Sequence, residues 1–199
     1  MDVDYTKLRA HVAHVVRDLE LGIKEPVRNP KVRLDVVRGL QGEVRAGKFI
    51  FRTDAAEDAG GFAQHPRPMD YLLGALASCQ QMWCLRWAAL NGHAFRSLAI
   101  EAESVFTWEG EYLARTDAGI TELRVAYHVD APGLSDDDLY DMADTVQSRC
   151  PIFATLRRVA PIRESFVVPD RPVRGRQWLV GVAHAQAARE GPQDRGPGS

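Results

Sequence analysis

The chain has 199 residues, of which 45% are hydrophobic and 26% charged, as is typical of a soluble globular domain with an ordinary core. A net charge of −2 and a pI of about 6.3 give no field of one sign, which argues against nucleic acid or an anionic membrane as a partner. The longest charge-free apolar stretch, Tyr71 to Leu85, is 15 residues long, short of the ~18 that suggest a membrane span. The first residues lack the basic start and apolar run of a signal peptide, so we expect a cytoplasmic protein.

The N-terminal part of the sequence predicts a helix and then a hairpin. Residues 4–22 carry apolar side chains at helical spacing, so residues 1–30 are expected to form a helical extension. Two runs with strand-like alternation follow, at 32–36 and 48–52, and they predict an antiparallel hairpin with one solvated face. Residues 54–67 are rich in Gly, Asp, Ala and Pro and predict a loop.

A strongly apolar helix is predicted next. Pro68 suits a first helical position, Asp70 lies in the first turn where the helix dipole favours a carboxylate, and Asn91-Gly92 ends the helix after about Leu90. Sixteen of residues 69–90 are hydrophobic, and they are distributed around the whole circumference. Such a helix must be buried on all sides, in a core or in a subunit interface.

The C-terminal part predicts a second strand pair, a broken helix and a last strand. The strands are expected at 98–107 and 121–130, and a helix begins at Ser135 with a run of acidic residues. Pro151 interrupts that helix, so a kink or a new helix is expected near Cys150. Residues 163–168 then read as a strand.

The order of elements predicts an α+β fold with an antiparallel sheet. From residue 169 the composition changes, and residues 169–199 are expected to be a C-terminal extension in which 178–182 could dock and the end, 191–199, is disordered.

Two cysteine motifs carry a family resemblance. Cys79 ends a Pro-Met-Asp-Tyr-Leu-Leu run that begins at Pro68, and Cys150 opens a Cys-Pro run that leads to Leu156-Arg157. With the acidic, Gly-rich approach of Asp54 and 60–61, residues 31–168 resemble the OsmC/Ohr superfamily, the osmotically induced and organic-hydroperoxide-resistance proteins, in an OsmC-like branch.

The resemblance implies an OsmC-like fold, with antiparallel sheets around long buried central helices, completed by an intertwined homodimer with active sites at the interface. It also implies thiol peroxidase chemistry on organic hydroperoxides, without a cofactor, in oxidative-stress defence. Cys79 would attack the peroxide and become a sulfenic acid, Cys150 would condense with it to a disulfide, and a dithiol reductant would reset the site.

The resemblance also implies an arginine held over the nucleophile by a glutamate. Arg38 resembles the family arginine more closely, and Arg45 is the alternative. The family glutamate would follow the proline, where this chain has Met69. Asp70 lies one place later, about 100° around the helix, and is the candidate to hold the arginine or else a first-turn partner of the helix dipole.

Plainer readings stay open beside this one. Free cysteines are often small core residues, and Cys84, about 140° around the helix from Cys79, is expected to be structural. The histidines form no cluster, and no metal site is expected. The alternative function is a non-catalytic homodimer that binds a small apolar or sulfur-containing ligand, and the two extensions could have an interaction role of their own.

Overall fold

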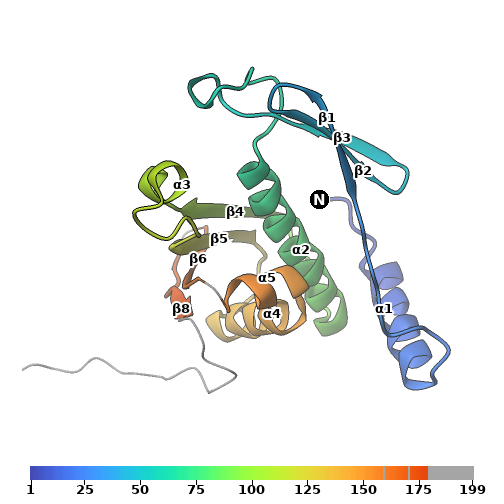
Figure 1. Cartoon of the computed structure of the whole chain (residues 1–199). Helices are drawn as coiled ribbons and strands as arrows, with labels where there is room; N and C mark the ends of the chain where they lie inside the picture. Colours follow the sequence, from blue (N-terminus) through green and yellow to red (C-terminus); the bar gives the residue numbers. More distant parts are fainter. Residues whose placement is uncertain (159, 170, 179–199) are drawn as a thin grey trace, which may run out of the picture.

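The computed structural model describes residues 1–158, 160–169 and 171–178, and it has an α+β fold (Figure 1). The helices are α1 (Tyr5–Glu20), the short 3₁₀ helix η1 (Glu57–Ala59), α2 (Pro68–Asn91), α3 (Trp108–Leu113), α4 (Asp136–Arg149) and α5 (Pro151–Leu156). The strands are β1 (Arg33–Arg38), β2 (Gln41–Ala46), β3 (Phe49–Thr53), β4 (Ser97–Val105), β5 (Glu122–Asp130), β6 (Ile162–Val168), β7 (Arg171–Pro172) and β8 (Arg176–Trp178).

The predicted N-terminal helix is present as α1 and docks on the C-terminal half of α2. Its N-cap Asp4 accepts a hydrogen bond from the Lys7 amide. The Arg9 Nε donates to the Ala89 carbonyl oxygen at 2.5 Å, near the end of α2 where carbonyls lack helical partners. Val12 is the buried residue of α1, so much of its apolar stripe stays exposed.

The first sheet has three strands in the order β1-β2-β3, whereas the sequence predicted a hairpin of two. The missing strand is β2, whose Gly and alternating charges give a weak strand signal. It pairs antiparallel with both neighbours, through the tight turns at Gly39 and Gly47, which both have positive φ. The strands of the predicted hairpin are therefore the two edges of this sheet.

The alternation of side chains gives this sheet one apolar and one charged face. Cross-strand partners share a face, so the register divides the residues cleanly. The charged face contains Arg33, Asp35, Glu43, Arg45, Ile50 and Arg52, with ion pairs along it. The apolar face contains Leu34, Val36, Val44, Phe49 and Phe51, and of these only Val44 is buried.

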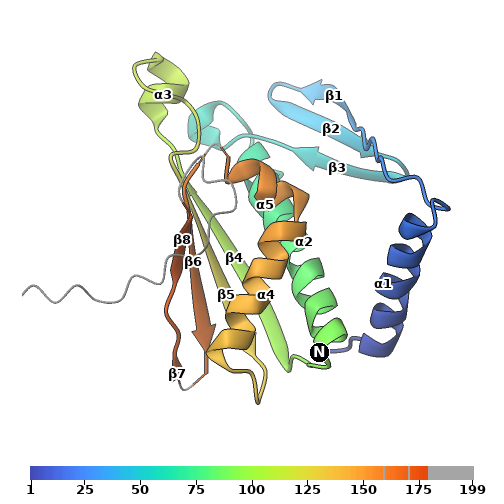
Figure 2. The ribbon, with the colours of Figure 1, turned by 90° about the horizontal axis from the view of Figure 1, so that it is seen from below.

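The long helix α2 begins at Pro68 as predicted and ends at Asn91, where it is capped by Gly92 in a left-handed conformation. It lies beside α4, and the two helices cover the same face of the second sheet (Figure 2). One side of α2 is left exposed in the single chain; its residues are Gly74, Ala75, Ser78, Gln81 and Met82. The helix that the sequence predicts to be buried all round is thus covered on only part of its circumference.

The second sheet has the order β4-β5-β6-β7, and β8 also pairs with β6. The pairing is antiparallel except between β5 and β6, which are parallel, in contrast to the antiparallel sheet predicted. The reason is the α4–α5 connection, since a helical crossover returns the chain in the same direction. Strands β7 and β8 show that the sheet continues into the segment predicted as an extension. Of the predicted docking segment, 178–182, only residue 178 is described, as the last residue of β8. The predicted disordered end, 191–199, lies outside the described residues.

The core lies between this sheet and the helices α2, α4 and α5. Buried residues of β5 and β6 alternate with more exposed ones along each strand. The largest fully buried side chains are Trp87, Tyr127, Phe153, Leu76, Leu123, Leu139, Met142 and Ile162. The short helix α3 between β4 and β5 was not predicted; Thr107 caps it, and its Trp108 and Tyr112 are exposed. In the described part of the chain, no helix combines the length and apolar character needed to cross a membrane.

Candidate active site

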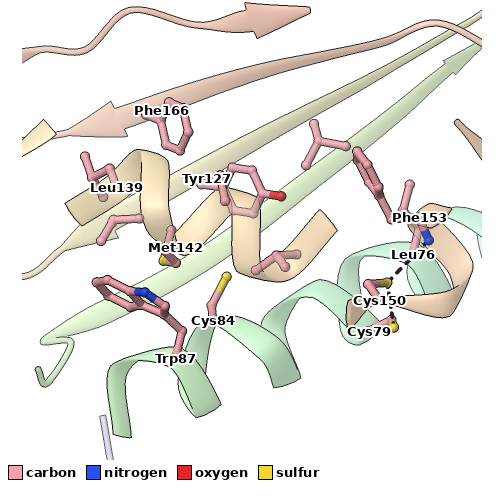
Figure 3. Close-up of a cluster of buried hydrophobic side chains, with 14 of the residues drawn as sticks. Leu76, Cys79, Cys84, Trp87, Tyr127, Leu139, Met142, Cys150, Phe153 and Phe166 are labelled. Carbon is pink, nitrogen blue, oxygen red and sulfur yellow. Dashed lines mark hydrogen bonds between the residues drawn. The ribbon is translucent and has the colours of Figure 1, made fainter. Parts of the chain in front are cut away.

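The structure brings Cys79 and Cys150 together from elements far apart in the sequence. Cys79 lies on α2 and Cys150 at the junction of α4 and α5, and their Sγ atoms are 2.6 Å apart (Figure 3). Both are free thiols in this structure, and a disulfide bond between them would measure about 2.05 Å. In this geometry the Cys150 thiol donates a hydrogen bond to the Cys79 sulfur.

Cys150 is also the N-cap of α5. The predicted break occurs at this point, because α4 ends at Arg149 and Pro151 is the first residue of α5. The Cys150 sulfur accepts a hydrogen bond from the Phe153 amide at 3.3 Å. The Cys150 sulfur, at the junction of α4 and α5, thus gives a hydrogen-bond partner to an amide in the first turn of α5.

The position of Cys150 at the start of a helix does not outweigh its burial. Burial raises the pKa of the Cys150 thiol to about 12, and the contact with Cys79 adds to the rise. The amides of Phe153 and Ile152 offset only part of it. At neutral pH Cys150 is therefore a thiol, which is the form that can donate to Cys79.

The two sulfurs differ in access to solvent. Cys79 is 7% exposed, whereas Cys150 is fully buried. Leu76 and Phe153, both fully buried, lie beside the pair (Figure 3). An apolar reagent that reaches this site would meet Cys79 first.

Cys84 takes no part in the pair. It is fully buried, and burial together with the nearby Glu164 carboxylate raises its pKa above the ordinary range. Such a thiol is unreactive, because the thiolate is the nucleophilic form. Its environment agrees with the structural role predicted for it.

Two further arginines, which the sequence reading did not single out, lie over the ring of Trp83. Trp83 is one helical turn from Cys79 on α2, and the guanidinium carbons of Arg86 and Arg149 lie 4.8 Å and 5.5 Å from its ring centroid. Arg149 directly precedes Cys150. Only the spacing of Trp83 from Cys79 was readable in the sequence; the approach of α4 to α2 was not.

The structure places Asp70 and Arg38 in separate contacts. Asp70 completes the capping box of α2 and pairs with Arg67 at 2.9 Å, which lowers the pKa of Asp70. Arg38 lies instead over the ring of Phe62, 3.8 Å from its centroid. Arg45 pairs with Glu43 at 2.8 Å. Within the described residues of one chain, no hydrogen bond or ion pair joins Asp70 to Arg38, or either Arg38 or Arg45 to a cysteine.

No metal centre is formed by the described residues, since no group of three or more His, Cys, Asp or Glu side chains is placed to hold an ion. The site is therefore a thiol pair in an apolar setting, at the junction of a central helix and a broken second helix of an α+β fold.

The sequence and the fold both match known proteins. The sequence profile of the family described as OsmC-like protein matches residues 61–165, more than half of the chain, so the chain belongs to the OsmC-like family. Among curated proteins, none matches the sequence significantly.

Solved structures show the same fold. An OsmC-like protein from Mycoplasma pneumoniae has 17% identity and a TM-score of 0.63, over 71% of this chain and 97% of that one. An organic hydroperoxide resistance protein from Legionella pneumophila has 16% identity and a TM-score of 0.56, over 72% of this chain and 100% of that one. Another, from Elizabethkingia anophelis, has 14% identity and a TM-score of 0.55, over 74% and 100%. The predicted α+β, OsmC-like fold of the chain and the predicted family are thus confirmed.

Proposed function

We propose that this protein reduces organic hydroperoxides through the Cys79–Cys150 pair, as a thiol-dependent peroxidase in defence against oxidative stress. The observation that carries the proposal is the 2.6 Å separation of two buried sulfurs from distant elements, Cys79 at 7% exposure and Cys150 at 0%. The likeness in fold to organic hydroperoxide resistance proteins supports the same class of substrate.

The reaction would proceed in three steps. The Cys79 thiolate attacks one oxygen of the O–O bond, which breaks; Cys79 becomes a sulfenic acid and the other oxygen leaves, with a proton, as the alcohol. The Cys150 sulfur then attacks the Cys79 sulfur, giving a disulfide and releasing water. A dithiol reductant returns both cysteines to thiols and is itself oxidised to a disulfide. The apolar walls favour apolar hydroperoxides over hydrogen peroxide.

We further propose that the working form is an intertwined homodimer. The apolar face of β1–β3 carries Val36 at 74% and Phe49 at 66% exposure. Large exposed apolar patches mark interfaces, and the exposed side of α2 provides a second one. Phe51 on the apolar face contacts Tyr71 of α2, with ring centroids 4.9 Å apart, so both surfaces border the same space. A second copy is the occupant that would cover both.

The test is hydroperoxide consumption with a dithiol reductant, using an alkyl hydroperoxide and hydrogen peroxide as parallel substrates. Cys79→Ser is expected to abolish turnover, while Cys150→Ser allows one oxidation of Cys79 and then stalls. Cys84→Ser is the matched control, because it changes a cysteine of the same helix outside the pair, and it should retain activity. Full activity in Cys79→Ser would refute the proposal.

A second candidate is a homodimer that binds a small apolar or sulfur-containing ligand without turnover. It is favoured by Met69 in place of the family glutamate and by the engagement of Asp70 with Arg67. A Cys79 that alkylates with the pH dependence of an ordinary thiol, and forms no disulfide when peroxide is added, would support this candidate instead.

A further inference from the structure

The long helix α2 carries a single charged residue after its first turn, and that residue is Arg86. Arg86 follows Cys79 by seven positions and Trp83 by three, so the three side chains lie along one face of the helix. Arg86 and Trp83 are both half-buried. A cation therefore interrupts an otherwise apolar helix on the face that also carries Cys79.

A second arginine reaches the same ring from α4. Arg149 is the last residue of α4, directly before Cys150, and its guanidinium carbon lies 5.5 Å from the centroid of the Trp83 ring. The α4–α5 junction thus contacts α2 at two points, Cys150 at Cys79 and Arg149 at Trp83. The two points on α2 are one turn apart, about 6 Å along the helix axis. The Trp83 ring, with its arginines, therefore lies beside the thiol pair.

Neither of these two guanidiniums has a carboxylate partner among the described residues, although both arginines lie within reach of solvent. No Asp or Glu occurs three or four positions from Arg86 or Arg149 in the sequence, where a helical ion pair would form. Arg176 shows the contrast, because it also lies over a ring, that of Tyr140, and pairs with Asp144 at 2.8 Å.

The Trp83 ring holds two positive charges close together. The guanidinium carbon of Arg86 lies 4.8 Å from the ring centroid, so those of Arg86 and Arg149 are within about 10 Å of each other. A cation–π contact engages the face of a guanidinium and leaves its N–H donors for other partners. Those donors form a fork that matches the two oxygens of a carboxylate. The chain thus presents paired cations with no internal counter-charge, an arrangement that attracts an anion.

We propose that Arg86 and Arg149, held on Trp83, form a subsite for the carboxylate of an amphipathic ligand whose apolar part lies at the thiol pair. The apolar part would meet the buried side chains of Leu76 and Phe153, and the carboxylate would lie about one helical turn away. This inference rests on the proposed function for the group that reacts, and it narrows the substrates to hydroperoxides that also carry a carboxylate. The subsite binds the end of the substrate that does not react.

The first test measures binding without turnover. Octanoate and its neutral analogue octanamide are titrated into full-length Cys79→Ser by calorimetry, and octanoate should bind more tightly. Arg86→Gln and Arg149→Gln should each weaken octanoate binding roughly 5-fold, the loss expected for a partly exposed ion pair. Arg163→Gln is the matched control, because it removes the same charge from an exposed residue of β6 that pairs with Glu122, and octanoate affinity should be retained.

The second test measures selectivity in the protein with all its cysteines. The substrates are ω-hydroperoxyhexanoate and its methyl ester, which differ in charge and share the reacting group. The ratio of their kcat/KM values should favour the carboxylate, fall roughly 5-fold in Arg86→Gln or Arg149→Gln, and stay at the wild-type value in Arg163→Gln. Added salt should lower the ratio, because it screens charges near the surface.

The outcomes separate the subsite from the peroxidase. Octanoate that binds no better than octanamide, or that loses affinity equally in Arg163→Gln, would overturn the subsite. Turnover of both substrates at a ratio that neither Arg86→Gln nor Arg149→Gln alters would also overturn it and leave the peroxidase proposal intact. Octanoate binding that depends on both arginines, without turnover of either substrate, would refute the peroxidase and support the subsite.

Discussion

Phe49→Glu should convert the proposed dimer to a monomer. Phe49 lies on the apolar face of β1–β3 and is 66% exposed in the single chain. A buried Phe contributes 150–250 Å² of contact area, so covering this side chain removes roughly 130 Å² of apolar surface from water. At about 25 cal/mol per Å² this contributes about 3 kcal/mol per chain, or about 6 kcal/mol for two symmetry-related copies. The dimer dissociation constant should rise by roughly 10⁴-fold.

The assay is sedimentation velocity over a wide range of protein concentration. Ile50→Glu is the matched control, because Ile50 is the next residue, is 57% exposed and lies on the charged face of the same strand. It places the same charge on the same strand and should leave the dimer intact. A dimer unaffected by Phe49→Glu, or weakened equally by both substitutions, would refute the assignment of the apolar face to the interface. A wild-type monomer would refute the dimer itself.

Three further predictions concern single groups. Peroxide should reduce the number of thiols titrated in denaturant from three per chain to one, with a Cys79–Cys150 peptide found by mass spectrometry; loss of Cys84 instead would contradict the pairing. Cys84→Ala should keep full peroxidase activity and lower the free energy of unfolding by about 1 kcal/mol in urea, since it leaves a small cavity in a closed core. Burial alone would raise the pKa of Asp54, but hydrogen bonds from the Gln41 side chain and three backbone amides lower it to about 2. This shift contributes stability that is complete above the unfolded value of about 3.9 and is lost as the pH falls through about 2. Asp54→Asn should therefore flatten the acid limb of stability against pH, and an unchanged limb would show that other carboxylates control it.

Much of the fold was readable from local signals. The Pro68 start and Gly92 stop of α2, the Ser135 cap of α4 and the break at Pro151 all use residues whose backbone preferences act locally. Strand β2 was missed because its apolar residues are few and its place is fixed by two glycine turns and by pairing on both sides. The parallel β5–β6 pair depends on how a crossover returns, which no local pattern records.

In the candidate site, too, the local motifs were readable from the sequence and the contacts between distant segments were not. Cys79 and Cys150 were recognisable from motifs, and the structure brings their sulfurs together. The contacts of Arg38 and Asp70 were not predictable from the sequence. Whether the Asp70 carboxylate pairs with Arg67 or with Arg38 depends on the conformation of the loop before α2. That loop is set by the buried bonds of Asp54, whose donors lie up to 13 residues away in the chain.

The hydrogen bond that caps α5 is accepted by a sulfur of the thiol pair, so it is sensitive to the oxidation state of that pair. The sulfur of Cys150 receives the Phe153 amide hydrogen, and the same sulfur faces Cys79. Oxidation to a disulfide replaces the S–H bond of that sulfur with an S–S bond and changes its direction, and so changes the hydrogen bond at the first turn of a six-residue helix. The amide resonance of Phe153 is therefore a built-in spectroscopic probe, which should shift when the thiol pair is oxidised and return when it is reduced, without any label attached to the protein.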